Sequence, residues 1–297
     1  MNKYRLITFL TLFFLSQRSF AAIYYLSPTG NDENNGSPSQ PWKSFAHAVQ
    51  QVSNGDEIVV NSGTYFETSI IQLNGIHNLI IRAADPDNRP VIDFVTRTNN
   101  NRIIIFNACA NITWDGINII NAGGVNSNDQ KRGTFSFEDW GKSVASENHV
   151  IKNSTISYSW NAAVYSFHVS GVKLENLTVH NNAKRVGDPV YSSYKDHPHS
   201  IIAWHGDNWV IKGCRIYENR GEGVGPYENC SGWLIEDNVV YDNHSINIYL
   251  DSEKGEHIVR NNLVYNTGYM AALAIDPNLD YGYKEAAGIR IANEISD

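Results

Sequence analysis

Six stretches of this sequence align with one another: WDGINIINA at 114–122, IKNSTISYS at 151–159, LENLTVHNN at 174–182, IKGCRIYEN at 211–219, IEDNVVYDN at 235–243 and VRNNLVYNT at 259–267. Their starts lie 37, 23, 37, 24 and 24 residues apart. The sixth position of every row is β-branched: Ile119, Ile156, Val179, Ile216, Val240 and Val264. A repeat of this length with strand-like positions is typical of stacked β-coils. The rows therefore predict short parallel strands, each paired with its counterpart one coil away, around an apolar interior.

The ninth position of three rows is asparagine, at Asn182, Asn219 and Asn243. Stacked amide side chains can form a ladder along such an array, and asparagine also favours turns. Both interpretations concern the fold, so these asparagines do not indicate a functional site.

The first residues have the features of a secretory signal peptide. Lys3 and Arg5 precede an apolar run at 6–15, and small residues at 19–21 suit a cleavage site. The run is too short to span a bilayer, and no other segment of the sequence is a candidate span. We therefore expect residues 1–21 to be removed and the protein to be secreted or periplasmic.

The chain without this segment is acidic. It keeps 20 basic and 31 acidic residues, a net charge of −11. Such a surface repels nucleic acid and anionic lipid. It also repels an acidic polysaccharide, unless the binding site is locally basic or holds a cation.

The three cysteines are expected to be free, buried thiols. Cys109 and Cys230 occupy equivalent positions four coils apart, which places them about 19 Å from each other at the usual strand spacing. A disulfide needs Cα atoms within about 7 Å. No Cys or His spacing predicts a metal cluster, so no cofactor is assigned with certainty, and Ca²⁺ is retained as a candidate.

The residues before the repeats predict a cap. A short strand at 24–26 and a polar loop precede Trp42, Phe45, Val49 and Val52, whose spacing indicates an amphipathic helix. Terminal repeats of such arrays need capping. We therefore expect residues 22–61 to lead through this helix into the first coil, and residues 62–297 to form the coils. The last coil, which begins at GIRIANEISD, is expected to be incomplete.

The stretches YYLSPTGND, PWKSFAHAV and GDEIVVNSGTY, followed by GEGVGPYENC and NVVYDNHSINIYLDS, resemble secreted bacterial right-handed parallel β-helix proteins. These pectate lyase-like proteins include several polysaccharide lyase families. The resemblance covers nearly all of the chain after the signal segment. It implies an all-β, right-handed parallel β-helix and a carbohydrate partner, and it is specific for the fold rather than for the chemistry.

Three coils are longer than the others, and each extra segment follows the strand that ends near Ile119, Val179 or Val264. The insertions should therefore emerge at one corner of the helix, where loops usually build a binding surface. The first runs from 121 to 148 and the second from 181 to 200. The second has a local net charge of +1 and two histidines on an otherwise acidic protein.

The second insertion supplies the candidate catalytic residues. β-Elimination on a uronic acid needs a group that neutralises the carboxylate, a base, and an acid for the leaving oxygen. Arg185 or Lys195 is the candidate neutraliser, and Tyr194, His197 or His199 the candidate for proton transfer. An ordinary polar surface loop is the alternative interpretation.

Strand residues are expected to complete the substrate-binding floor. If side chains alternate along the strands, four of them fall near the same faces of successive coils: His205, Tyr227, Tyr249 and Asp251. The tyrosines could stack on sugar rings, although aromatic columns also stabilise stacked strands.

The motifs of characterised β-helix enzymes are not reproduced. Lyases resembling chondroitinase B carry Lys and Arg on two consecutive coils, the Arg in an RHG-like motif, whereas this chain has Trp204-His205-Gly206. The Asp-Pro-His motif of alginate C5-epimerases is only loosely similar to the sequence at 196–199. The sequence thus predicts binding, and cleavage by β-elimination, of an acidic polysaccharide. A non-catalytic glycan-binding surface protein and a uronate C5-epimerase-like enzyme are the alternatives.

Overall fold

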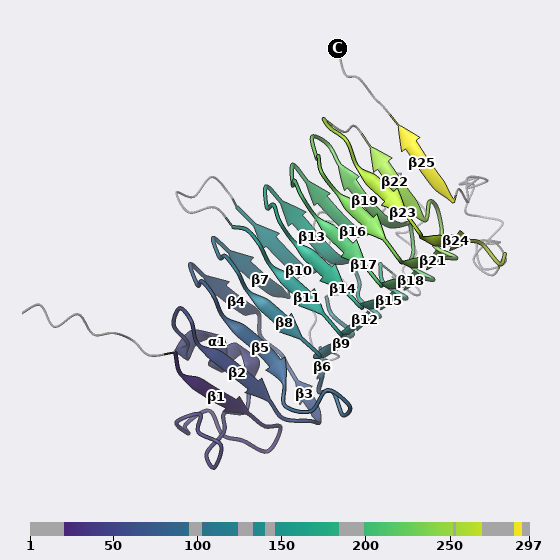
Figure 1. Ribbon diagram of the computed structural model, residues 1–297. Helices are drawn as coiled ribbons and strands as arrows, with labels where there is room; N and C mark the ends of the chain where they lie inside the picture. Colours follow the sequence, from purple (N-terminus) through teal and green to yellow (C-terminus); the bar gives the residue numbers. More distant parts are fainter. Residues whose placement is uncertain are drawn as a thin grey trace, which may run out of the picture.

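The computed structural model describes residues 21–94, 103–123, 133–139, 146–183, 199–251, 254–268 and 288–292. Their strands stack along one axis in three parallel sheets, so the chain is a right-handed parallel β-helix (Figure 1). Each coil passes from sheet 1 through sheet 2 to sheet 3. In the described residues, no helix is long and apolar enough to cross a membrane.

Sheet 1 has nine strands: β1 (Ile23–Leu26), β2 (Glu57–Val60), β5 (Ile80–Ala83), β8 (Thr113–Asp115), β11 (Val150–Lys152), β14 (Lys173–Glu175), β17 (Val210–Lys212), β20 (Leu234–Glu236) and β23 (Ile258–Arg260). Sheet 2 has eight: β3 (Thr64–Phe66), β6 (Val91–Asp93), β9 (Asn118–Ile120), β12 (Thr155–Ser157), β15 (Thr178–His180), β18 (Arg215–Tyr217), β21 (Val239–Tyr241) and β24 (Leu263–Tyr265). Sheet 3 also has eight: β4 (Ile71–Asn74), β7 (Ile104–Asn107), β10 (Gly133–Glu138), β13 (Ala162–Phe167), β16 (His199–Trp204), β19 (Glu222–Tyr227), β22 (Ile248–Asp251) and β25 (Ile289–Ala292).

The register of sheet 2 confirms the alignment of the six rows. The β-branched residues of the sixth position are partners strand by strand, from Ile119 to Val264. Ile119, Ile156, Val179, Ile216 and Val240 are all fully buried. Val264 is only half-buried, because β24 has a neighbour in the sheet on one side only.

The third position of each row makes the corner between sheets 1 and 2. Every residue there has a left-handed backbone, with φ between 53° and 73°: Gly116, Asn153, Asn176, Gly213, Asp237 and Asn261. A Cβ atom makes this conformation costly, and only Gly, Asn and Asp adopt it readily. The row pattern therefore encodes the corner as well as the strands.

The asparagine ladder is present. The Nδ2 atom of Asn182 donates to Oδ1 of Asn219 at 3.1 Å, and Nδ2 of Asn219 donates to Oδ1 of Asn243 at 2.9 Å. The series continues from Asn243 to Asn247 at 2.9 Å. Asn182, Asn219, Asn243 and Asn247 are buried, so these bonds stabilise the coils from inside.

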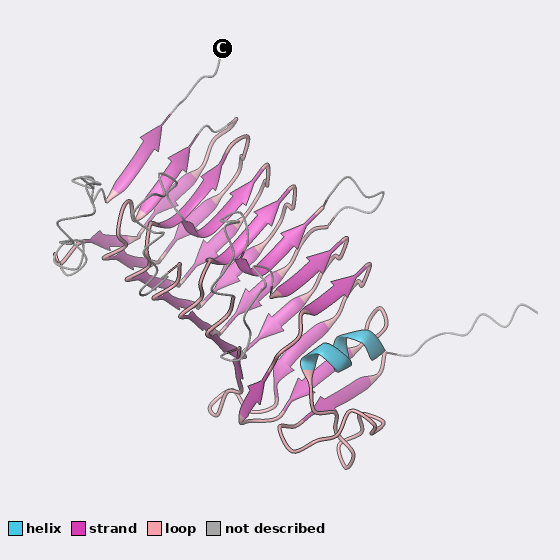
Figure 2. Cartoon of the chain, turned by 180° about the vertical axis from the view of Figure 1, so that it is seen from behind, coloured by secondary structure: helices cyan, strands magenta, loops and turns pink. Residues whose placement is uncertain are grey.

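Helix α1 (Phe45–Gln51) lies at the N-terminal end of the β-helix (Figure 2) and packs beside β4. It begins after the predicted position at Trp42, because Ser44 is its N-cap. The Asp32 carboxylate accepts hydrogen bonds from the backbone N–H groups of Lys43 and Ser44, which precede the helix. The Phe45 ring packs on the Trp114 ring, with centroids 5.8 Å apart. The helix thus covers the end of the core, as predicted.

The second and third insertions connect sheet 2 to sheet 3, between β15 and β16 and between β24 and β25. The first is divided by β10 into a connection from sheet 2 to sheet 3 at 121–132 and a connection from sheet 3 to sheet 1 at 139–149, both longer than in the next coil. The predicted common corner is therefore confirmed for the second and third insertions and only for part of the first. The predicted bounds need correction, because the segment at 121–148 contains strand β10 and the segment at 181–200 ends inside β16. Cys109, Cys214 and Cys230 are buried thiols that form no disulfide in the described part of the chain, as expected.

Candidate functional site

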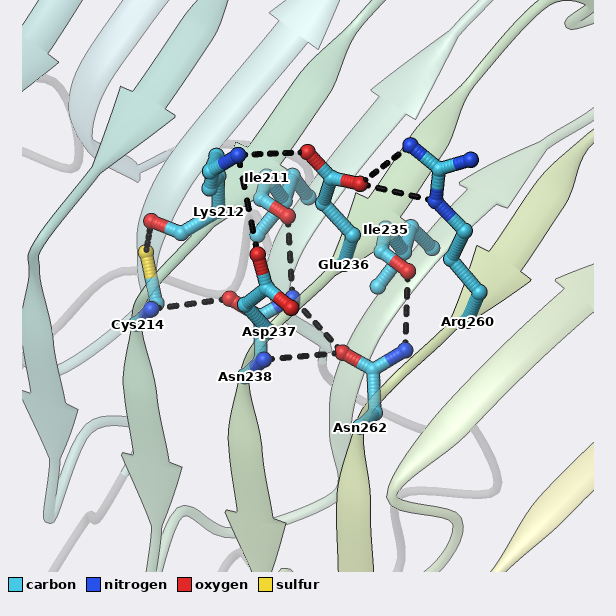
Figure 3. A network of polar contacts seen from close by, with 9 residues as sticks. All are labelled: Ile211, Lys212, Cys214, Ile235, Glu236, Asp237, Asn238, Arg260 and Asn262. Atoms are coloured by element: carbon cyan, nitrogen blue, oxygen red, sulfur yellow. Dashed lines mark hydrogen bonds and ion pairs between the residues drawn. The ribbon is translucent and has the colours of Figure 1, made fainter.

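The outer face of sheet 1 carries a column of alternating charges. The register places seven residues of opposite sign in succession: Arg82, Asp115, Lys152, Glu175, Lys212, Glu236 and Arg260. Glu236 accepts from Lys212 Nζ at 2.7 Å and from Arg260 Nε at 2.8 Å (Figure 3). The hydrogen bonds from Lys212 and Arg260 lower the pKa of the Glu236 carboxyl group. Because the charged side chains of this face pair with one another, they leave few charges to bind a charged polymer.

The outer face of sheet 2 carries stacked aromatic rings. Tyr217, Tyr241 and Tyr265 are register partners, with ring centroids 4.9 and 4.8 Å apart and ring planes within 5° of parallel. The Arg215 guanidinium donates to the Tyr241 hydroxyl at 2.6 Å. Because the rings cover one another's faces, this column stabilises the stack and does not offer flat surfaces for sugar rings.

The outer face of sheet 3 is different. It carries a second hydrophobic cluster, separate from the core, in which Phe167, Trp204 and Tyr227 are only partly buried. The Trp204 and Tyr227 rings are neighbours in register at 4.4 Å but are inclined by 49°. Their faces therefore do not stack on each other as the sheet 2 tyrosines do. Aromatic faces beside polar groups suit sugar binding.

Carboxylates and histidines lie among these aromatic residues. Glu138, Glu222 and Asp251 are buried at the ends of sheet 3 strands, and buried carboxylates are costly unless they are paired. Glu222 is the register partner of His199, and its Oε2 atom lies 2.5 Å from His199 Nδ1. The His199 ring lies 5.8 Å from the Tyr227 ring. His199, Glu222 and Tyr227 therefore form one cluster.

A second pair of histidines follows the same strands. His168 and His205 occupy equivalent left-handed turn positions after β13 and β16, with φ of 58° and 55°. Their rings stack with centroids 4.6 Å apart. Burial and the neighbouring His205 lower the pKa of His168, and Asp139 partly opposes this.

The structure brings together some of the residues predicted from sequence. Tyr227 and Asp251 are register partners on the outer face of sheet 3, and Tyr249 lies on the next strand, with the Arg290 guanidinium 5.5 Å from its ring centroid. His205 lies in the turn after β16 rather than on the strand. His199 begins β16 instead of belonging to a loop. Arg185, Tyr194, Lys195 and His197 lie outside the described residues.

The sequence interpretation missed Glu222, Trp204 and Phe167. The row alignment covers sheets 1 and 2, whereas these residues belong to sheet 3, where the second insertion interrupts the spacing. A signal was available: Trp204 and Tyr227 are each the last residue of a strand and precede a left-handed turn residue. Aligning the strands on these turns would have paired His199 with Glu222.

The described carboxylates and histidines do not gather into a metal site. Among them, no group of three or more Asp, Glu, His or Cys residues is arranged to hold an ion. Glu138 and Asp251 share one column, but Phe167, Trp204 and Tyr227 stand between them. Within the described residues, this face therefore offers no group of ligands for a calcium ion.

Comparison with known proteins identifies similar chains. Residues 24–259 match the family described as "Pel9A-like, right handed beta helix region". The chain is 22% identical to Pectate lyase L of Dickeya dadantii (strain 3937), over 92% of this chain and 64% of that protein. Pectate lyase Pel9A superposes with a TM-score of 0.65 at 19% identity, over 84% of this chain and 64% of that one. PfbA, a surface adhesin of Streptococcus pneumoniae, superposes with a TM-score of 0.54 at 14% identity, over 73% and 56%. The chain therefore spans less than two thirds of each of these proteins.

Proposed function

The chain belongs to the Pel9A-like right-handed β-helix family, and from this premise we propose that it is a secreted protein that binds an acidic polysaccharide and cleaves it by β-elimination. The observation that carries the proposal is the outer face of sheet 3. It alone of the three described outer faces combines inclined aromatic rings with a buried histidine–carboxylate pair. The other two faces are occupied by their own charge and ring ladders.

In the proposed reaction, a base takes the proton from the carbon beside the sugar carboxyl group. The electron pair left behind forms a carbon–carbon double bond, the bond to the leaving oxygen breaks, and that oxygen takes a proton from an acid. His199 is the described candidate for the base, and Tyr194, His197 and Tyr227 are the candidates for the acid. Phe167 and Trp204 would contact sugar rings, with Tyr249 and Asp251 on the following coil.

The sugar carboxylate needs a neutralising group, because the described part of this face carries several carboxylates. Arg185 and Lys195 of the second insertion are proposed for this role, and a bound Ca²⁺ ion is the alternative. Addition of EDTA distinguishes them, since it should abolish turnover only if calcium neutralises the carboxylate.

The test is incubation of the full chain with a panel of uronic acid polymers. A lyase produces absorbance from the unsaturated product together with new reducing ends, whereas an epimerase changes the sugar composition and produces neither. Lys195→Ala and His197→Ala should each reduce turnover while leaving the melting temperature unchanged. His199→Ala should reduce turnover and also lower the melting temperature, because it leaves the buried Glu222 carboxylate without its partner. If all three variants keep full activity on a verified substrate, the proposed site is wrong.

A non-catalytic glycan-binding protein is the second candidate, favoured by the partly buried strip of Phe167, Trp204 and Tyr227. Such a protein would bind a polymer without shortening it. Trp204→Ala would then weaken binding, and His199→Ala would not.

A further inference from the structure

The pair formed by His199 and Glu222 links two successive coils. His199 begins β16, Glu222 begins β19, and the two residues are register partners. Nδ1 of the imidazole lies 2.5 Å from Oε2 of the carboxylate, and the two side chains are 10% and 3% exposed. The imidazole therefore meets the carboxylate through one particular nitrogen in a site that contains little water.

Neither of these two atoms has another partner. His199 Nδ1 and Glu222 Oε2 are both buried, and neither makes a hydrogen bond of regular direction, to the other or to any further described atom. A buried polar atom without a partner is unfavourable. Because the two atoms are only 2.5 Å apart, an imidazole that turns to direct an Nδ1–H at Oε2 satisfies both atoms at once. The carboxylate thus selects the tautomer that has its proton on Nδ1.

The other imidazole nitrogen is left for chemistry. Nε2 of His199 makes no hydrogen bond to any described residue, and the ring lies beside Tyr227, edge to face at 68°. In the tautomer with Nδ1 protonated, Nε2 carries the lone pair and can accept a proton. Glu222 itself is too buried to reach a polymer, so its role would be exerted through the imidazole.

We propose that Glu222 is a positioning residue that holds the imidazole of His199 with its proton on Nδ1, so that Nε2 is the proton acceptor in β-elimination. This inference deepens the proposed function and rests on it. The proton taken from the sugar carbon resides on Nε2, and the positive imidazole is stabilised by the carboxylate. When Nε2 later releases that proton to solvent, the same tautomer is restored.

The chain offers a matched control. Lys212 and Glu236 form an ion pair between the coil that contains Glu222 and the next coil, on the outer face of sheet 1. Glu236→Gln breaks a cross-coil ion pair, as Glu222→Gln does, but remote from the proposed site. If Glu222→Gln lowers kcat only because the coils stack less tightly, Glu236→Gln should lower kcat by a similar factor.

The experiment measures kcat and KM on a cleaved polymer and records the ¹⁵N resonances of His199 at neutral pH. We expect Glu222→Gln to lower kcat about 10- to 100-fold with little change in KM, and to replace the Nδ1-protonated signal by a mixture of tautomers. Glu222→Asp, which keeps the carboxylate, should recover part of kcat. Glu236→Gln should change neither kcat nor the resonances.

Unchanged kcat and an unchanged tautomer in Glu222→Gln would overturn the inference, as would a wild-type imidazole protonated on Nε2 alone. A tautomer that changes without loss of kcat would also overturn the catalytic role. If the wild type cleaves no polymer, the proposed function fails, and with it the role in elimination. The resonances then still decide whether Glu222 sets the tautomer. If Glu222→Gln does not fold, the inference is tested by the tautomer of His199 in the wild type and by the kcat of Glu222→Asp.

Discussion

Replacing Asn219 by alanine should destabilise the protein strongly, although the residue is far from any proposed chemistry. Its side chain is fully buried and makes four hydrogen bonds. Nδ2 donates to the carbonyl oxygen of Val179 at 3.1 Å and to Oδ1 of Asn243 at 2.9 Å. Oδ1 accepts from the backbone N of Asn182 at 3.0 Å and from its Nδ2 at 3.1 Å.

The magnitude follows from these bonds. A typical intramolecular hydrogen bond contributes about 0.5–1.5 kcal/mol net, so the loss of four amounts to roughly 2–6 kcal/mol. The larger values apply where Asn182 and Asn243 are left with buried groups that lack partners. Whole domains are stable by only about 5–15 kcal/mol. Asn219→Ala is therefore expected to remove a large fraction of the stability.

Equilibrium unfolding in urea, followed by circular dichroism and tryptophan fluorescence, measures the effect. With a slope of about 3 kcal/mol per molar urea, a loss near 4 kcal/mol lowers the midpoint by about 1 M. Asn88→Ala is the control, because Asn88 is exposed and its side chain makes no hydrogen bond to the described residues; its midpoint should stay near that of the wild type. Equal midpoints for the two variants, with equal slopes, would refute the reasoning.

Three further results are expected. Ile216→Asp places an unpaired charge in the core and should cost at least about 4 kcal/mol, whereas Ile216→Val should cost about 0.5–1.5 kcal/mol; a wild-type melting curve for the aspartate variant would show that the residue is not inside. Lys212→Gln interrupts the charge column of sheet 1 and should lower the melting temperature slightly in dilute buffer, and the difference should vanish in 1 M NaCl, where the Debye length is about 3 Å; a salt-independent difference would contradict an electrostatic origin. Burial lowers the pKa of His149 to about 3. The contribution of His149 to the free energy of unfolding is therefore complete above the unfolded pKa near 6.5. It is lost as the pH falls towards 3, by up to about 1.4 kcal/mol per pH unit. His149→Phe should flatten this acid dependence in urea midpoints measured between pH 4 and 7, and an unaltered dependence would show that His149 is not its source.

The sequence by itself determined the coils. Strand positions, the asparagine ladder and the left-handed corner residues recur at fixed places in each row, because side-chain direction and turn conformation depend on neighbouring residues only. The capping helix was also predictable from its spacing, although Ser44 and Asp32 decide where it starts. The common corner of the second and third insertions followed from counting residues, whereas β10 divides the first insertion between two corners.

Only the tertiary structure paired His199 with Glu222. The two residues are 23 positions apart, and their contact depends on the register of β16 and β19 in sheet 3, which the aligned rows of sheets 1 and 2 do not include. The difference between the stacked rings of Tyr217 and Tyr241 and the inclined rings of Trp204 and Tyr227 was equally absent from the sequence. Ring inclination and the burial of a carboxylate result from packing between coils, and packing is decided by the whole fold.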